Sequence, residues 1–276
     1  VGAPDRAGRH AILKIHTRNV KLDEDVDLNR IAQITAGFSG ADLANIVNEA
    51  ALLAVRNDHE AVTMDDLELA IERIVAGLQR KMRLKPEIKR RVAYHEGGHA
   101  LVAYMQPDTA PVQKVSIVPT AKGALGYTLQ MPDEDTYLLC KQQLEERLAV
   151  MLGGRAAELI IFDDTSTGAS NDLERATDIA RRMVTEFGMT EVLGPVRYAN
   201  SAGMSYLGQV GGVRQDVSPE TAKLIDQETR RIVEEAEHRA VSILQNNIDA
   251  LNEVARVLQA EEVIDGDEIA RIAGPR

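Results

Sequence analysis

The sequence predicts a mainly α-helical protein with a small β-hairpin or sheet. Of its 276 residues, 44% are hydrophobic but only 3% are aromatic and none is Trp, a composition that suits helices packed through aliphatic side chains. Apolar residues recur at helical spacing along most of the chain, and they alternate in the manner of β-strands only between Val112 and Gln130. The length suffices for one large or two ordinary domains.

The composition also argues against several classes of function. The formal net charge is −11 and no basic stripe is evident, so a nucleic-acid partner is not expected. The single cysteine, Cys140, cannot form an internal disulfide, and a metal site must therefore rest on histidine and carboxylate. No apolar run reaches about 18 residues and no signal peptide is recognisable. We expect any membrane anchor to lie outside this chain, which lacks an initiator Met.

The first part of the chain is expected to form four helices. Helical spacing covers Arg6–His16 and Asp27–Ile34. Ser39 and Thr63 are each followed three residues later by Asp, the pattern of a capping box that opens a helix, and Gly77 is placed to end the last one. Together, these four helices are expected to form one compact module.

The next helix carries the motif on which the functional prediction depends. Pro86 begins this helix, and His95 and His99 follow with a spacing of four residues. Residues so spaced share a helix face, so both imidazoles can bind one metal ion, while Glu96 is displaced around the helix, where a general base belongs. The pattern predicts a zinc-dependent peptidase. The two glycines after Glu96 disfavour a helix, and we expect them to make room for a packed neighbour or for substrate.

A β-hairpin is expected beside the metal helix, with its turn at 120–123. Its second strand could pair with an extended peptide, as many peptidases hold their substrates. A role in merely covering the core is equally compatible with the pattern. The candidate substrate strand consists of Gly123, Ala124, Leu125, Gly126 and Tyr127.

Two carboxylates compete for the third ligand position, because catalytic zinc has three protein ligands and one open position. An amphipathic helix is expected over Thr136–Leu152, ending at Gly153-Gly154, and the apolar run that follows contains Glu158. There an unpaired carboxylate is costly, so Glu158 could instead orient a ligating histidine. Asp172 begins a helix, capped by Ser170, after a polar loop. The positive end of that helix would hold Asp172 ionised, and Asp172 is the predicted ligand.

The rest of the chain is expected to be mostly helical. The glycine-rich stretch 196–217 predicts a long mobile loop. Ser218-Pro219 then starts a long helix to about Gln245, and 247–258 and 267–272 supply two shorter helices.

The first module resembles the C-terminal helical lid of AAA ATPases. This resemblance rests on two motifs, Gly37-Phe38-Ser39-Gly40-Ala41-Asp42-Leu43 and Ile12-Leu13-Lys14-Ile15-His16. It implies that His16, Gly40 and Ala41 approach the adenine and ribose of a nucleotide, although small residues at a helix start and a surface histidine need no such role. No Gly-x-x-x-x-Gly-Lys-Ser/Thr loop occurs in the chain, so we expect no ATP hydrolysis by it.

The remaining motifs together resemble the peptidase domain of the FtsH family, membrane-anchored AAA zinc proteases. These motifs are Tyr94 to Ala100, Gly153 to Glu158 and Thr167 to Thr177. The resemblance implies one zinc ion per chain, held by His95, His99 and Asp172, with Glu96 as the catalytic base. It also implies an all-α AAA lid at residues 1–78, a linker at 79–85 and a mainly helical zinc metallopeptidase domain at 86–276.

The same resemblance implies an endopeptidase that degrades unfolded or membrane proteins fed to it by an attached AAA ATPase ring. A homo-hexamer would then form at the cytoplasmic face of the bacterial inner membrane, or of an equivalent organelle membrane. ATP and Mg²⁺ would be needed only in the full-length protein. The alternative is a non-catalytic assembly or regulatory module stabilised by a structural metal.

Overall fold

The computed structural model describes residues 2–79, 82–121, 123–131, 138–198 and 217–275. Within these ranges the protein is mainly α-helical, as predicted, with one small sheet. The helices are α1 (Arg6–His16), α2 (Leu28–Ile34), α3 (Gly40–Arg56), α4 (Met64–Ala76), α5 (Pro86–Tyr104), α6 (Lys141–Phe162), α7 (Ser170–Thr185), α8 (Pro219–Asn246), α9 (Ile248–Glu261) and α10 (Gly266–Ala273). The strands are β1 (Val112–Ser116), β2 (Tyr127–Gln130) and β3 (Val263–Asp265). None of the described helices is both long enough and apolar enough to span a bilayer.

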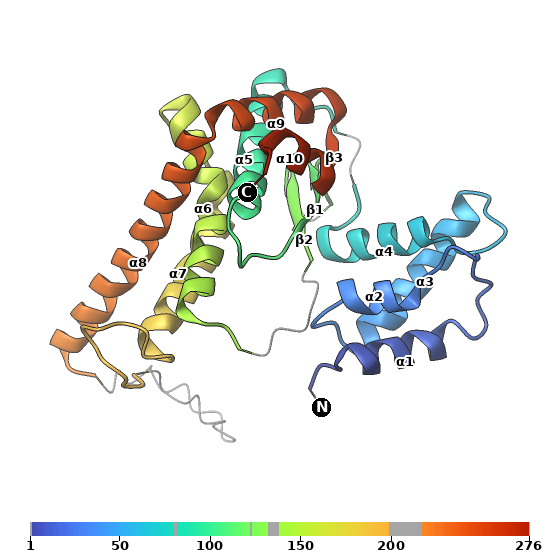
Figure 1. Ribbon diagram of the computed structural model, residues 1–276, viewed down its shortest axis with the longest axis horizontal. Coiled ribbons are helices and arrows are strands. Elements are labelled where there is room, and N and C mark those ends of the chain that lie inside the picture. Colours follow the sequence, from blue (N-terminus) through green and yellow to red (C-terminus); the bar gives the residue numbers. More distant parts are fainter. Residues whose placement is uncertain (1, 80–81, 122, 132–137, 199–216, 276) are drawn as a thin grey trace.

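Helices α1 to α4 form a separate group with its own hydrophobic core (Figure 1). Both predicted capping boxes are present: Ser39 pairs with Asp42 at the start of α3, and Thr63 pairs with Asp66 at the start of α4. Gly77 ends α4 with a positive φ of 94°, a backbone conformation that suits glycine. The four predicted helices are thus confirmed.

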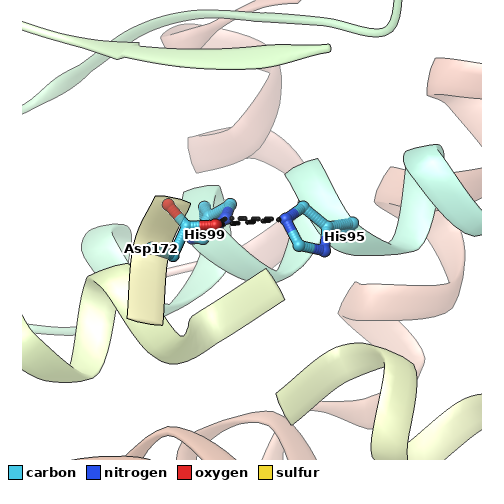
Figure 2. A group of neighbouring side chains, drawn as sticks. All are labelled: His95, His99 and Asp172. Carbon is cyan, nitrogen blue, oxygen red and sulfur yellow. Dashed lines mark hydrogen bonds and ion pairs between the residues drawn. The ribbon is translucent and has the colours of Figure 1, made fainter. Parts of the chain in front are cut away.

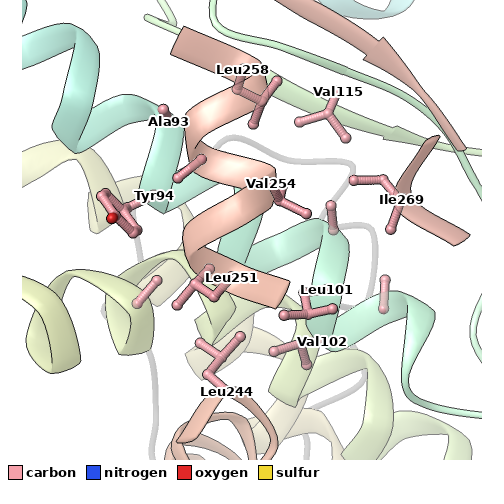
Figure 3. Packing of buried hydrophobic residues seen from close by; sticks show 14 of the residues in the cluster. Ala93, Tyr94, Leu101, Val102, Val115, Leu244, Leu251, Val254, Leu258 and Ile269 are labelled. Carbon is pink, nitrogen blue, oxygen red and sulfur yellow. The ribbon is translucent and has the colours of Figure 1, made fainter. Parts of the chain in front are cut away.

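Helix α5 lies at the centre of the second hydrophobic core. Every residue from Val92 to Ala103 is buried, so this helix has no solvent-facing side along those three turns. Figure 3 shows α9 crossing it, with Leu251, Val254 and Leu258 directed into the same cluster as Leu101. The core therefore holds the predicted metal helix in a fixed orientation.

Helices α5 and α6 approach each other closely through glycines. A Cβ added at Gly98 would lie 2.4 Å from the carbonyl oxygen of Gly153, closer than real Cβ contacts occur. This contact bears out the expectation that glycines after Glu96 make room for a neighbour. It also corrects the predicted helix end at Gly153-Gly154, because α6 continues through both glycines to Phe162. These glycines allow helix packing rather than ending the helix.

The expected hairpin is present as part of a small three-stranded sheet. Strand β1 pairs antiparallel with β2 and also with β3, giving the order β2-β1-β3. The third strand was not predicted, because only three residues adopt it and its partner lies far away in the sequence. The turn at 120–123 is confirmed by a hydrogen bond from the amide of Gly123 to the carbonyl of Thr120.

Several predicted boundaries differ from the structure or lie outside its described residues. The helix expected from Thr136 begins at Lys141, while 132–137 are not described. The loop prediction for 196–217 falls largely on 199–216, which are also outside the described residues. Ser170 is the first residue of α7 rather than its cap, since a short 3₁₀ turn capped by Ser166 precedes it. The long helix predicted after Ser218 is confirmed as α8.

The division into 1–78, 79–85 and 86–276 stays a prediction. Side chains of Leu129 and Met131, beyond the predicted linker, pack in the core of the lid helices. The first four helices and strand β2 therefore share buried surface.

Candidate metal centre

Two histidines of α5 bring their Nε2 atoms together in the buried interior. These atoms of His95 and His99 lie 3.2 Å apart. Nδ1 of His95 lies 2.8 Å from a carboxylate oxygen of Glu158, and Nδ1 of His99 lies 2.7 Å from the carbonyl oxygen of Val150. Both Nδ1 atoms face acceptors and so donate to them, which leaves Nε2 as the nitrogen of each ring that can bind a metal ion. The two Nε2 atoms therefore face one shared position.

Asp172 completes the group from a different helix. It lies in the first turn of α7, as predicted, and its Oδ2 is 3.5 Å from Nε2 of both His95 and His99. In Figure 2 the carboxylate and the two imidazoles approach a common point from α7 and α5. The three residues could hold one metal ion.

The size of this triangle fits zinc. Tetrahedral coordination with bonds of about 2.0–2.1 Å separates ligand atoms by about 3.3 Å. The observed separations of 3.2, 3.5 and 3.5 Å are close to that value. Gly154 of α6 keeps the position open, because an added Cβ there would lie 2.6 Å from Nε2 of each histidine. The donor set and the space beside it both suit a zinc ion.

Glu158, the competing carboxylate, lies behind His95 rather than beside the Nε2 atoms. It is 1% exposed and accepts hydrogen bonds from Arg91 at 2.9 Å, from the Ser166 amide at 2.7 Å and from the Ser166 hydroxyl at 2.9 Å. Burial raises the pKa of Glu158, but the hydrogen bonds from His95, Arg91 and Ser166 outweigh it and lower this pKa to about 2. Glu158 is thus an ionised carboxylate that fixes the ring of His95.

Glu96 is buried beside the metal-binding group without belonging to it. Its Oε2 lies 3.1 Å from the hydroxyl of Thr128, and the same hydroxyl lies 3.1 Å from the main-chain carbonyl of Glu96. Burial raises the pKa of Glu96, while the neighbouring histidines and the Thr128 hydrogen bond oppose the rise. A carboxylate with a raised pKa accepts a proton more readily.

Hydrogen bonds within the metal-binding group shift the pKa values of its members. Burial lowers the pKa of His95, but hydrogen bonds to Asp172 and Glu158 reverse this effect and raise it to about 10. Burial likewise acts against the ionised form of Asp172, yet the two histidines hold its pKa below the ordinary value. A bound metal ion would take over the role of the proton on His95.

The candidate substrate strand lies partly where it was predicted. Tyr127 begins β2, whereas residues 123–126 lead into the strand and do not pair in it. A Cβ added at Gly126 would lie 2.8 Å from Cγ of Glu96, so the chain passes directly over that carboxylate. Strand β2 is an edge of the sheet. Its role in binding peptide stays a prediction.

The candidate nucleotide residues lie in the lid helices. His16 is exposed at the end of α1, and Gly40 and Ala41 begin α3. A Cβ added at Gly40 would lie 3.8 Å from Cδ1 of Ile12, so α1 and α3 meet near this point. Their nucleotide-binding role stays a prediction.

Four further residues of the site were not found from the sequence. Arg91 lies four residues before His95, so helical spacing could have indicated it. Thr128, Gly154 and Ser166 carry no such signal, because their contacts with the site depend on how β2, α6 and the loop before α7 pack.

Comparisons with known proteins show which families the chain is similar to. Residues 82–272 match the family described as Peptidase family M41, and residues 25–69 match the AAA+ lid domain. Over 276 residues the chain is 51% identical to ATP-dependent zinc metalloprotease FtsH 4 of Synechocystis sp., covering 99% of this chain and 44% of that protein. It is 50% identical over 271 residues to ATP-dependent zinc metalloprotease FtsH of Syntrophobacter fumaroxidans, covering 98% and 42%. The chain therefore spans less than half the length of these relatives.

Proposed function

The chain belongs to peptidase family M41, and from this premise we propose that it is the proteolytic part of an ATP-dependent zinc endopeptidase. One observation carries the proposal. His95, His99 and Asp172 direct three donor atoms at one point, and Glu96 lies beside this group without being part of it. A purely structural zinc site has four protein ligands and needs no base, whereas the group found among the described residues has three.

His95, His99 and Asp172 would hold the zinc ion, which when bound supplies a Lewis acid that activates water and polarises a carbonyl. Glu158 keeps Nδ1 of His95 occupied, so that Nε2 stays directed at the ion. Glu96 accepts the proton of the attacking water and then delivers it to the leaving amine. Thr128 holds one oxygen of that carboxylate, Oε2, and leaves Oε1 for the transfer.

The position of β2 at the edge of the sheet favours an extended peptide as the substrate. Its outer edge has no partner strand in the described sheet, so its backbone groups can pair with a peptide by adding a strand. Residues 123–126 approach Glu96 and lead directly into β2, and a peptide bound there would pass close to the base. Only an unfolded segment presents its backbone in this way, which favours unfolded polypeptides as substrates.

The names of the relatives describe them as ATP-dependent. The match to an AAA+ lid domain supports ATP dependence of the full-length form of this protein as well. ATP and Mg²⁺ would act there in a domain other than the peptidase, with His16, Gly40 and Ala41 close to the nucleotide. We further propose a homo-hexameric ring, attached to the cytoplasmic face of a bacterial or organelle membrane by a segment outside this chain, that feeds unfolded or membrane proteins to the metal centre.

Cleavage of an unfolded protein tests the proposal directly. The zinc-loaded chain should degrade casein without ATP, a chelator should stop the reaction, and added zinc should restore it. Absence of cleavage by protein with one zinc ion per chain would favour the alternative, a non-catalytic assembly or regulatory module whose metal is structural.

A further inference from the structure

Strand β2 lies between the lid helices and the metal helix, and successive residues face opposite sides, as in any β-strand. Tyr127, Leu129 and Met131 pack with the lid core. Thr128, between the first two, contacts Glu96 of α5. Figure 1 shows β2 at the place where α4 meets the rest of the molecule. One short strand therefore contacts both the lid and the proposed catalytic base.

On the lid side the contact is made by a buried carboxylate. Glu72 of α4 is 4% exposed and accepts hydrogen bonds from the hydroxyl of Tyr127 and from Nζ of Lys114, the latter at 2.5 Å. Gln79 adds a third donor at 3.3 Å. Tyr127 and Lys114 belong to the paired strands β2 and β1, so Glu72 ties α4 to both. Removing one of these partners would leave the buried carboxylate of Glu72 incompletely hydrogen-bonded, which costs free energy.

On the other side, Glu96 is contacted by Gly126, just before β2, and by Thr128 within it. Gly126 passes close to Cγ and Oε1 of Glu96, where no side chain would fit. The Thr128 hydroxyl contacts both Oε2 and the main-chain carbonyl of Glu96 at 3.1 Å. A shift of β2 would therefore move these contacts and change the orientation in which the Glu96 carboxylate is held.

We propose that Glu72 is a positioning residue for the catalytic base: it holds Tyr127, and Thr128, the next residue of the strand, holds Glu96. The placement of lid helix α4 then sets the orientation of the carboxylate in the metal centre. This inference rests on the proposed function, in which Glu96 takes the proton from water. A change of about 1 Å in such a group can lower the reaction rate a hundredfold, so small displacements of β2 matter.

A double-mutant cycle in the zinc-loaded chain tests the coupling. Glu72→Gln leaves one acceptor oxygen where the carboxylate has two, so Tyr127 and Lys114 can no longer each have an oxygen of their own. Thr128→Val removes the hydroxyl at nearly constant shape. With an unstructured casein peptide, we expect Glu72→Gln to lower kcat about fivefold, the effect of roughly one net hydrogen bond. KM and the zinc content should stay unchanged. In the Thr128→Val background, the same substitution should have little further effect on kcat, because the connection is already broken.

Two controls separate this role from a general loss of structure. Glu68 lies on α4, as Glu72 does, and Glu68→Gln removes its ion pair with Arg30 of α2. This variant should leave kcat unchanged. Thr128→Ser keeps the hydroxyl and should retain most of the kcat that Thr128→Val loses. If Glu72→Gln fails to fold, Tyr127→Phe replaces it in the cycle with the same expected coupling.

Independent effects would overturn the inference. If Glu72→Gln lowers kcat by the same factor with and without the Thr128 hydroxyl, or leaves kcat unchanged, Glu72 only fastens the lid to the sheet. Failure of the proposed function gives a different result, because the parent chain would then be inactive or Glu96→Gln would remain active.

Discussion

Oε1 of Glu158 lies 2.8 Å from Nδ1 of His95, the nitrogen on the side of the ring away from the metal-facing Nε2. One atom of an imidazole can donate to a carboxylate while the other binds a metal ion, and the carboxylate then fixes the ring's direction. The two carboxylates that competed for the third ligand position therefore have different positions relative to the same ring: Asp172 faces Nε2, and Glu158 faces Nδ1.

The first prediction separates these two roles. Asp172→Asn should weaken zinc binding by removing an anionic donor, and Glu158→Gln should weaken it less, because changes behind a ligand typically cost about 10–100-fold in affinity or activity. Competitive titration with a chelator measures both variants against the parent. The assignment of Asp172 as a ligand would be wrong if Glu158→Gln released zinc more readily than Asp172→Asn.

The second prediction concerns the base. Glu96→Gln keeps the shape of the side chain but cannot accept a proton, so kcat for peptide cleavage should fall by about a hundredfold or more. Zinc should remain bound at one ion per chain, since Glu96 is not among the three donors. Full activity of the variant, or loss of its zinc, would contradict the role assigned to Glu96.

The third prediction concerns the space beside the two histidines. Gly154→Ala would place a methyl group 2.6 Å from both Nε2 atoms, and zinc affinity should fall while the helix itself gains about 1 kcal/mol of intrinsic propensity. Gly97→Ala is the matched control, because its methyl would meet Val254 and no ligand atom. Metal analysis after dialysis should show a reduced zinc content only for Gly154→Ala.

The fourth prediction concerns the stability of the lid in acid. Burial raises the pKa of Asp66, but hydrogen bonds with His59 and Thr63 outweigh burial and hold it below the ordinary value of 3.8. A folded-state pKa that is depressed contributes stability above the unfolded value, and this contribution disappears as the pH falls from about 3.8 through the folded value. Asp66→Asn should therefore lower the free energy of unfolding at neutral pH and flatten its decline in acid. Unfolding with urea at several pH values provides the measurement, and an unchanged slope in the variant would refute the prediction.

The fifth prediction concerns nucleotide. The sequence contains no Gly-x-x-x-x-Gly-Lys-Ser/Thr loop, so purified chain should cleave unfolded peptides without hydrolysing ATP. Phosphate release measured together with peptide cleavage tests both halves. ATP turnover that persists through purification would disprove it.

The sequence alone determined the features that depend on neighbouring residues. The spacing of His95 and His99 places both rings on one face of a helix wherever that helix packs. The capping boxes at Ser39 and Thr63 likewise depend on groups three residues apart, and both helices begin as predicted. Asp172 was correctly placed in the first turn of its helix for the same reason, although its role as a zinc ligand remains a prediction.

Packing between distant segments decided the rest. Gly153 and Gly154 carry a local signal for a helix end, yet α6 continues through them because its contact with α5 requires their missing side chains. Strand β3 pairs with β1, although the two strands lie far apart in the sequence. The contact between Thr128 and Glu96 depends on the position of β2. Such contacts depend on side-chain volume and on hydrogen-bond partners far away in the chain. Only the folded arrangement of α5, α6, α7 and the sheet therefore determined which carboxylate meets the histidine Nε2 atoms and which residue holds the base.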